Sequence, residues 1–569
     1  KIAYKRATQD FPMTDRGDTL LCKPCHWAVN NFDKFMAKQY GFQSFLDLLA
    51  KGCSLLLDLE VCSMTINRYA DIIYFSILDH YFDSEFVCTA IGVCSNHYYT
   101  LSADDFAREV LKDKPEIVEE PSFSSKKPLK VLQLSDMHID PKYKENSEAD
   151  CGQPACCRDR VENPKKPAGK WGTLASCDLP IRTVEKMIEQ IASEINPDMI
   201  LWTGDNDTHD VWKLHNNTAS EATHILGKIL YNNLVNITKA PLFPALGNHE
   251  EKTVDIFNPY NLSMEKPLLD NITEVYKLFI EEAQAKEFNK QGYYTAKHAD
   301  TNLRIIALNP FLCDSVNFYL IRDPTDPLHQ IDFLRKTLDE AEKSGEKVFV
   351  IGHIPPQISY HLNECTKRYN VIMERYRNIV RGQFYGHTHQ DENKVIKGYF
   401  NRSDNVGNVF IAPSTTTYSE LNPSFRVYEV DPETWYMKNL YQYRLNLTDA
   451  NLHPEKELKW TLAYDFNSLY ETKHLHDFDK LMENFQKIKT DKQQFQKILK
   501  EYYTNGPSYE KNKDSEKKQR SFWCSLTSDS FEDSLRCSSL GSSFLGFISN
   551  TLTGKWYFKE SDKEDIFIK

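Results

Sequence analysis

Short apolar runs recur through the middle of the chain, and each one ends in a polar motif. Four runs are bounded by glycine or proline, as buried strands are, and they cover residues 199–202, 242–246, 348–351 and 383–385. A fifth run, residues 130–135, ends at Asp136-Met137-His138. In open α/β sheets, ligands gather beyond the carboxyl ends of the strands. We therefore expect the loops after these five runs to converge.

A helical spacing of apolar residues occurs on both sides of this region. It appears in the first hundred residues, again from Ile181 to Ile195, and again beyond residue 448, where Leu481, Phe485 and Leu499 share one face. The chain therefore has an all-α start, an α/β centre and a helical end. Its length of 569 residues fits two or three domains.

These patterns divide the chain into five segments. We expect an unstructured lead, a six-cysteine helical unit, a proline-containing linker, an α/β domain and a C-terminal helical domain, over residues 1–17, 18–98, 99–128, 129–448 and 449–569. The linker is expected to pack on the next domain, because Phe106, Val110 and Leu111 recur at helical spacing. No apolar run reaches transmembrane length, so we expect no membrane span.

The charge balance narrows the possible partners. A net charge of −12 and a pI near 5.8 argue against nonspecific nucleic-acid binding. In a compartment more acidic than this pI the sign reverses, because the 17 His also begin to protonate. The molecule would then adhere to an anionic lipid surface.

The cysteines indicate an oxidising, secretory route. There are 14 Cys, and they occur with seven Asn-x-Ser/Thr sequons. We infer that Lys1 follows a trimmed leader. Six Cys before residue 98 allow fifteen connectivities, and a zinc knot competes with disulfides for the group at residues 151–177. The oxidising context and the lack of a paired Cys-x-x-Cys favour disulfides there; Cys313 with Cys365 and Cys524 with Cys537 remain as further pairs.

The polar motifs offer carboxylate, imidazole and amide groups, which together suit two divalent metals. Two metals can clamp a phosphoryl group during in-line displacement. An isolated Asp-x-His is ordinarily a solvated loop, but five such motifs in order at strand ends favour a metal site. The motifs are Asp136-Met137-His138, Gly204-Asp205, Gly247-Asn248-His249-Glu250, Gly352-His353 and Gly386-His387-Thr388-His389.

This order of motifs resembles that of the calcineurin-like metallophosphoesterases over about the central three hundred residues. The resemblance implies a β-sandwich flanked by helices. It also implies that Asp136, His138 and His389 hold one metal, that Asn248, His353 and His387 hold a second, and that Asp205 bridges the two. Two zinc ions are the family's expectation, although the ligand set would also take manganese or iron.

The six-cysteine unit resembles a saposin domain, a helical unit that binds lipid; the alternative is a disulfide-linked helical bundle with a dry core. With Trp202-Thr203-Gly204-Asp205, His209-Asp210-Val211-Trp212 and the C-terminal helices, the whole chain resembles the acid sphingomyelinase family. The resemblance implies the disulfides Cys22–Cys94, Cys25–Cys88, Cys53–Cys62, Cys151–Cys156 and Cys157–Cys177.

Further roles follow from the same resemblance. His249 is the expected general acid, assisted by His209, and both would be protonated at acidic pH. The alternative for His209 is that it orients Asp205. Tyr418 corresponds to an aromatic residue near a choline head group, or else it simply packs in the core. Val316 stands where the family has an acidic residue, which bears on head-group selectivity.

We expect glycans on six of the seven sequons, at Asn216, Asn236, Asn261, Asn271, Asn401 and Asn446. Asn206 lies directly beside the bridging Asp205, and we expect it to be unmodified because a glycan there would crowd the metals.

The sequence thus predicts a secreted or lysosomal, monomeric phosphodiesterase that cleaves membrane sphingomyelin to ceramide and phosphocholine at acidic pH. One alternative is a phosphodiesterase for nucleotides or other phospholipids. Another is a catalytically inactive lipid-binding or lipid-transfer protein.

Overall fold

The computed structural model describes residues 39–72 and 103–530, apart from positions 56, 117, 160, 214–220, 252, 299, 324 and 358–359. It also describes residues 23–24, 26–28, 30–31, 533 and 537.

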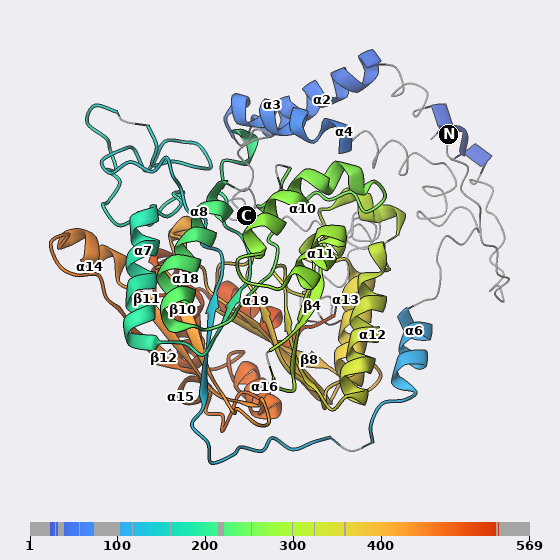
Figure 1. The fold of residues 1–569 in the computed structure, drawn as a ribbon. Helices are drawn as coiled ribbons and strands as arrows, with labels where there is room; N and C mark the ends of the chain where they lie inside the picture. Colours follow the sequence, from blue (N-terminus) through green and yellow to red (C-terminus); the bar gives the residue numbers. More distant parts are fainter. Residues whose placement is uncertain are drawn as a thin grey trace.

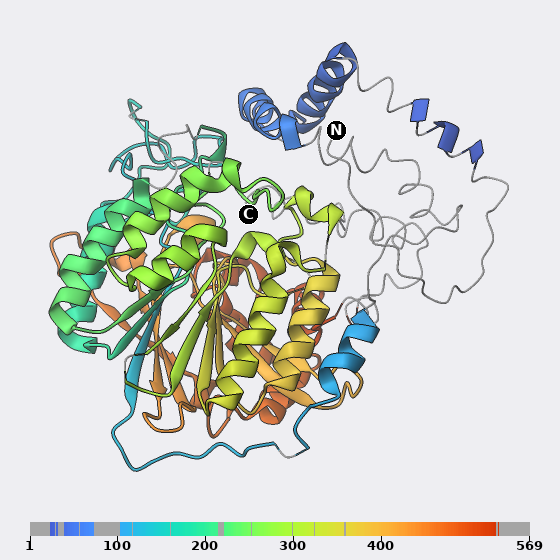
Figure 2. The ribbon, with the colours of Figure 1, turned by 45° about the vertical axis from the view of Figure 1, so that its right-hand side comes forward.

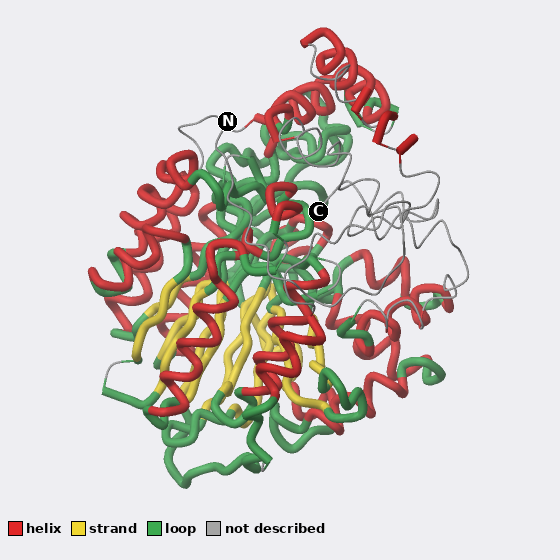
Figure 3. Tube along the Cα trace, turned by 90° about the vertical axis from the view of Figure 1, so that its right-hand side faces the viewer, coloured by secondary structure: helices red, strands yellow, loops and turns green. Residues whose placement is uncertain are grey.

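Two six-stranded sheets form the centre of the described chain, as the predicted sandwich requires. The first sheet has the order β12-β11-β10-β1-β2-β3 and the second has the order β4-β5-β6-β7-β9-β8. Figure 3 shows the strands at the centre of the molecule with helices around them. The strands are β1 Leu129–Leu134, β2 Met199–Trp202, β3 Leu242–Pro244, β4 Tyr294–Lys297, β5 Leu303–Ala307, β6 Lys347–Ile351, β7 Val380–Tyr385, β8 Glu392–Lys397, β9 Asn405–Ile411, β10 Ser424–Val430, β11 Met437–Leu445 and β12 Trp460–Asp465.

The inner strands of both sheets are parallel, so the loops that follow them lie at the same end of each sheet. β1, β2 and β3 run parallel in the first sheet, and β5, β6, β7 and β9 run parallel in the second. Residues of β2 and β6 are buried on both faces, which explains why these strands appear in the sequence as unbroken apolar runs. The carboxyl ends of the parallel strands therefore open onto loops at one end of each sheet.

Helices cover the outer faces of the sheets (Figure 1). Each buries an apolar stripe; α7, for example, buries Val184, Met187 and Ile188. The principal helices are α7 Ile181–Gln190, α8 Glu221–Leu230, α10 Leu262–Tyr276, α11 Glu282–Gln291, α12 Gln330–Lys343, α13 Asn363–Arg375, α14 Leu447–Leu452, α15 Phe466–Tyr470, α16 Phe478–Lys487, α17 Lys492–Tyr502, α18 Pro507–Asn512 and α19 Glu516–Thr527.

The sheet continues past residue 448, where we expected only helices. β12 pairs antiparallel with β11 and forms the edge of the first sheet. Thr461 and Leu462 in this strand are exposed, so it lacks the continuous apolar run that identified the inner strands. The helices α16, α17 and α19 follow as predicted.

The N-terminal helical unit, which we define as residues 39–72, lies at one end of the two sheets (Figures 1 and 2). It contains α2 Gln39–Cys53, α3 Leu59–Arg68 and α4 Ala70–Ile72, and the disulfide Cys53–Cys62 joins α2 to α3. The expected pairs Cys22–Cys94 and Cys25–Cys88 lie outside the described residues. Within the described residues, no helix is long and apolar enough to cross a membrane.

The linker does pack on the sandwich, as its apolar spacing predicted. It forms helix α6 Ala103–Leu111, whose Ala107 and Val110 are buried against Val371 of α13. After this helix, the Glu119 carboxylate accepts hydrogen bonds from Arg381 Nη2 at 2.8 Å and from Lys347 Nζ at 3.1 Å. The linker is therefore fixed to the amino-terminal ends of β6 and β7.

Candidate metal centre

The polar loops meet at one end of the two sheets, as their positions after the strands predicted. In the first sheet, Asp136 N donates to Gly204 O at 3.1 Å and His138 N donates to Asp205 O at 3.2 Å. The two sheets are joined where His387 N donates to Asp136 Oδ1 at 2.8 Å. Loops that are far apart in the sequence therefore form one continuous hydrogen-bonded floor.

Asp136, His138, Asp205 and His389 form a first buried group, in which all the candidate ligand atoms lie within 4.8 Å of one another. His138 Nε2 is 3.4 Å from Asp205 Oδ2, and His389 Nε2 is 3.5 Å from Asp136 Oδ1. The two Nε2 atoms of His138 and His389 are 3.2 Å apart. Atoms with lone pairs that face one another so closely are typical of a cation site.

Asp205, His353 and His387 form a second such group. His353 Nε2 is 3.0 Å from Asp205 Oδ2, and His387 Nδ1 is 3.1 Å from Asn248 Oδ1. Asp205 belongs to both groups, which is the position that a bridging carboxylate must occupy. The structure therefore brings together all seven residues that the motifs singled out.

The histidine tautomers fit a metal centre. His138 Nδ1 lies 2.5 Å from Asp207 O, and His353 Nδ1 lies 2.7 Å from Thr203 O. A carbonyl oxygen only accepts, so Nδ1 carries the hydrogen in both rings and each Nε2 keeps a lone pair. His353 Nε2 is buried and faces Asp205 Oδ2 at 3.0 Å. That lone pair is left for a cation.

The charges of the cluster are strongly coupled. Burial raises the pKa of Asp136 to about 6. Burial would lower the pKa of His353, but the Asp205 and Asp136 carboxylates outweigh it and raise this pKa to about 10. The pKa of His138 rises to about 9 in the same way, with Asp205 opposing the effect of burial. The buried carboxylates therefore favour positive charge at these two rings, which divalent cations would supply when bound.

Five of the seven residues have a left-handed backbone, which is rare for residues other than glycine. The φ angles are 49° at Asp136, 31° at His138, 58° at Asp205, 72° at His387 and 62° at His389. Each such residue costs about 1–3 kcal/mol, and such residues cluster at functional sites. A Cβ on Gly247 would collide with Asp205 N and Oδ1, so glycine is required where these loops touch.

Two buried carboxylates support the cluster, and the motifs did not identify their roles. Glu250 accepts hydrogen bonds from Gly247 N and Asn206 N, both at 2.7 Å, and so ties the Asp205 loop to the Asn248 loop. Asp255 Oδ1 accepts from Asn248 Nδ2 at 2.7 Å, which turns Asn248 Oδ1 toward His387. Burial raises the pKa of both carboxyl groups to about 7. Glu250 stood within a quoted motif, whereas Asp255 had no sequence signal.

His209 lies beside the cluster and is held on two sides. Its Nδ1 is 2.6 Å from Asp178 Oδ1, and its backbone N donates to Asp178 Oδ2 at 2.8 Å. Its ring stacks on Tyr418, with centroids 3.6 Å apart and planes within 2° of parallel. Burial, followed by the charges of His138 and His249, holds the pKa of His209 well below its usual range. Asp178 had no sequence signal.

Tyr418 is buried, and its hydroxyl donates to Pro154 O at 2.7 Å. One face of its ring is covered by His209, so that face is closed to a choline group. These contacts give Tyr418 a packing role beside His209, which was the alternative considered for it.

His249 is buried beside His138, and the ring centroids of the two residues are 4.8 Å apart. Its backbone N donates to Asp205 Oδ1 at 2.9 Å, while its Nδ1 has no hydrogen-bond partner among the described residues. Burial lowers the pKa of His249 to about 4. Burial therefore disfavours the protonated form of both histidines, which we expected to be protonated at acidic pH.

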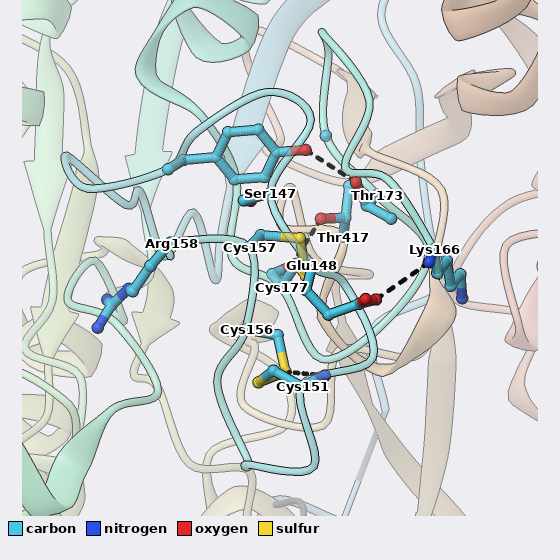
Figure 4. Close-up of a disulfide and its surroundings, with 12 residues drawn as sticks. Ser147, Glu148, Cys151, Cys156, Cys157, Arg158, Lys166, Thr173, Cys177 and Thr417 are labelled. Atoms are coloured by element: carbon cyan, nitrogen blue, oxygen red, sulfur yellow. Dashed lines mark hydrogen bonds between the residues drawn. A yellow bond between two sulfur atoms is a disulfide. The ribbon is translucent and has the colours of Figure 1, made fainter. Parts of the chain in front are cut away.

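The loop between β1 and α7 is closed by two of the expected disulfides, Cys151–Cys156 and Cys157–Cys177 (Figure 4). Their sulfur atoms are paired, which leaves no thiolate for a zinc knot. Thr417 Oγ1 donates to Cys177 O at 2.7 Å, so the loop is attached to the segment that carries Tyr418. Cys313–Cys365 and Cys524–Cys537 are also present.

The sequons differ sharply in exposure. Asn206 is 1% exposed, and its amide is engaged by Trp202 Nε1, Thr223 Oγ1 and Glu250 Oε1. Asn216 lies outside the described residues. The remaining five asparagines are exposed: Asn236, Asn261, Asn271, Asn401 and Asn446.

Comparison with known proteins agrees with this site. Residues 129–391 match the calcineurin-like phosphoesterase family, and residues 404–536 match the acid sphingomyelin phosphodiesterase C-terminal region. Sphingomyelin phosphodiesterase B of Dictyostelium discoideum is 32% identical over 481 residues, which are 80% of this chain and 72% of that protein. Sphingomyelin phosphodiesterase A of the same organism is 31% identical over 495 residues, 81% of each protein. The cyclic GMP-AMP phosphodiesterase of Homo sapiens is 28% identical over 358 residues, 60% of this chain and 75% of that protein.

The two-sheet fold with its shared-carboxylate cluster is therefore that of a calcineurin-like phosphoesterase, a metal-dependent phosphodiesterase. Within this class, the chain belongs to the acid sphingomyelin phosphodiesterase family, since the relatives of that name match it over four fifths of its length.

Proposed function

We propose that this chain hydrolyses sphingomyelin to ceramide and phosphocholine. The observation that supports this most is the set of seven donor residues, buried except for the half-buried His387, with Asp205 shared between its two halves. The sphingomyelin phosphodiesterases of Dictyostelium discoideum match the chain over both the phosphoesterase region and the C-terminal region.

We propose zinc as the cation in both halves of the site. Asp136, His138 and His389 would hold one ion, Asn248, His353 and His387 the other, and Asp205 both. Nitrogen-rich donor sets of this kind suit zinc, although they also accept manganese or iron. When bound, two such ions supply an acidified water and neutralise charge on the phosphoryl oxygens.

The protein's own residues have to handle the leaving group. As a water oxygen forms its bond to phosphorus, the bond from phosphorus to the ceramide oxygen breaks, and that oxygen needs a proton. His249 is the proposed donor, with His209 beside it, their ring centroids being 4.7 Å apart. Burial lowers the pKa of both rings, and an anionic phosphodiester placed next to them would raise it. The substrate therefore helps to protonate its own acid.

The N-terminal helical unit is proposed to be a saposin domain that presents membrane lipid to the site. Its Leu48 and Leu55 are exposed by 66% and 84%, which is unusual for large apolar residues in so small a unit. We further propose that the protein is a glycosylated monomer, lysosomal or secreted, that acts on anionic lipid surfaces at acidic pH.

A substrate panel tests the proposal. The full chain is assayed at acidic pH on sphingomyelin vesicles, ATP and a soluble chromogenic phosphodiester, with and without a chelator. We expect sphingomyelin to be the preferred substrate and the chelator to abolish its hydrolysis. His387→Ala should lower the rate at least about 100-fold, whereas His453→Ala, on the surface, should leave it unchanged.

Two outcomes would contradict the proposal. Preference for ATP would favour a nucleotide phosphodiesterase instead. Binding of vesicles without hydrolysis of any substrate by zinc-loaded protein would favour a lipid-binding protein.

A further inference from the structure

The N-terminal helical unit touches two loops of the metal centre directly. Val61 of α3 is buried against Trp212, three residues after His209 in the chain. Ile72 of α4 is buried against Ile256, which follows the Asn248 loop. This unit therefore contacts the segments that carry a proposed proton donor and a proposed metal ligand, at the end of the sheets where it lies in Figure 2.

One hydrogen bond from this unit reaches the support of the metal ligand. Tyr69, directly after α3, donates its hydroxyl hydrogen to Val254 O at 2.8 Å. The next residue, Asp255, accepts from Asn248 Nδ2 at 2.7 Å. Val254 and Asp255 thus connect Tyr69 of the N-terminal helical unit to the amide of Asn248.

Two features of Asp255 explain why a hydrogen bond from Tyr69 to the neighbouring Val254 would matter for the metal site. Its φ is 69°, a left-handed conformation that is unfavourable for aspartate. Its carboxylate also selects one of the two possible orientations of the Asn248 amide, because the carboxylate oxygen accepts and the amide nitrogen donates. If the amide turned over, Asn248 would present N–H groups to the centre, and an N–H group cannot bind a cation.

We propose that Tyr69 is a positioning residue for the metal centre. Its hydroxyl fixes the backbone at Val254, so that Asp255 keeps Asn248 Oδ1 turned toward His387. The N-terminal helical unit then has a second task besides lipid presentation, because it completes the support of one metal site. This inference rests on the proposed role of Asn248 as a ligand.

The first test measures metal retention and needs no substrate. Zinc-loaded full chain is mixed with excess chromophoric chelator, and the release rate is followed for wild type and Tyr69→Phe. The variant keeps the ring among Ile72, Ile256 and Tyr319 and removes only the hydroxyl. Loss of one hydrogen bond should speed the release of one zinc equivalent by about 2- to 10-fold.

The matched control is Tyr293→Phe. Tyr293 also donates its hydroxyl to a backbone carbonyl, Leu328 O at 2.7 Å, but it lies beside β4 at the edge of the second sheet. This control should release zinc at the wild-type rate. Equal release from Tyr69→Phe and wild type would overturn the proposal.

A second variant tests the order of the relay. Asp255→Asn tolerates the left-handed backbone, but its amide can pair with either orientation of Asn248. It should speed zinc release about 10-fold or more, and adding Tyr69→Phe to it should change the rate little further. Fully additive effects of the two changes would contradict a relay through Asp255.

Activity on a soluble chromogenic phosphodiester, without lipid, completes the test. At limiting zinc, Tyr69→Phe should lose activity by about the factor seen in release, and saturating zinc should restore it; a loss that zinc does not restore would count against the proposal. If wild-type protein fails to cleave sphingomyelin, the release comparison still decides the role of Tyr69. If Tyr69→Phe behaves as wild type, the proposed role of Tyr69 fails, while the proposal that the chain cleaves sphingomyelin still stands.

Discussion

Asp178 shows how one buried carboxylate can set the orientation of an imidazole, that of His209, whose catalytic role is proposed. It accepts hydrogen bonds from both the backbone N and Nδ1 of His209. Asp178→Asn would replace an oxygen by an NH2 group, and one of these two bonds would be lost. We expect kcat on a soluble phosphodiester to fall by about 10- to 100-fold, with zinc content unchanged. Asp270→Asn, in an exposed ion pair, is the control; equal kcat values in the two variants would refute the role.

His476 provides a pH-dependent contribution to stability away from the site. Its Nε2 accepts from Met437 N at 3.0 Å, and burial, followed by Arg381 and His474, holds its pKa well below its usual range. The unfolded chain takes up a proton below pH 6.5 that the folded chain does not. This contribution is therefore present above pH 6.5 and is lost as pH falls, by at most about 1.4 kcal/mol per pH unit.

The His476→Gln variant can still accept from Met437 N but does not titrate. We expect its thermal midpoint to fall less than that of wild type between pH 7 and pH 5, as measured by scanning calorimetry. Parallel midpoint curves for the two proteins would show that His476 does not contribute.

Asn206 is expected to be free of glycan although it stands in a sequon. Its side chain is enclosed by hydrogen bonds, and a folded chain offers no path to it. Mass spectrometry of the peptide that spans Asn206 should show the unmodified mass, while the exposed Asn236 and Asn261 should carry glycan. A glycan mass at Asn206 would show that modification precedes folding of this loop.

At this scale, the sequence predicted residues that belong to motifs and missed those that act through space. The seven donor residues stand directly after strands, so their convergence followed from the sheet. Asp178 supports His209 from a separate loop, and only the three-dimensional structure brings the two near. Asp255 supports Asn248 from seven residues further along the same loop, where no motif marks it. The lowering of the pKa of His249 was not predicted either, because its depth of burial is not visible in the sequence.

Among the elements, helix α2 and the turn that follows it present apolar residues that nothing in the described chain covers. Leu48 and Leu55 are the most exposed of these. Replacing both with serine should weaken binding to vesicles by about 10-fold or more, since each buried leucine contributes about 1.5–3 kcal/mol. Co-sedimentation measures the binding, and hydrolysis of a soluble phosphodiester should change far less.

The matched control for the serine substitutions at Leu48 and Leu55 is Leu452→Ser. Leu452 is 70% exposed but lies in α14, on the catalytic part of the chain. Equal loss of vesicle binding in the control would mean that the N-terminal helical unit has no special affinity for lipid.

Elements were predictable in proportion to their burial. The inner strands β2 and β6 are buried along both faces, so their unbroken apolar runs identified them. The edge strand β12 was missed because Leu462 is exposed and only Trp460 is deeply buried. Helix α6 was predicted from its spacing, and the structure adds that it is fixed on α13.

For the whole molecule, the charge balance predicts a pH-dependent attraction to anionic membranes. The chain carries −12 at pH 7, and it becomes net positive below its pI near 5.8. Its affinity for anionic vesicles should therefore rise by roughly 10-fold or more from pH 7 to pH 4.5, and high salt should reverse the gain. Neutral vesicles serve as the control. Affinity independent of pH and salt would mean that apolar contacts alone drive binding.

The order of motifs along the whole chain predicted the class of fold better than any single motif. Five polar motifs after five strands predicted strand ends that meet, and the resemblance of their order to that of the calcineurin-like metallophosphoesterases implied the sandwich. The contact between the N-terminal helical unit and the loops after His209 and Asn248 was not predictable, because Tyr69 and Trp212 have no special spacing in the sequence.

The division of donors between the two sheets has a consequence for biosynthesis. Asp136, Asp205 and Asn248 emerge from the ribosome well before His353, His387 and His389, and neither half of the chain holds a complete coordination sphere. Ion uptake must therefore wait until translation has passed residue 389 and the sheets have come together. Metal occupancy would then report that the nascent chain is correctly assembled, and a product truncated before residue 389 would lack part of the donor set.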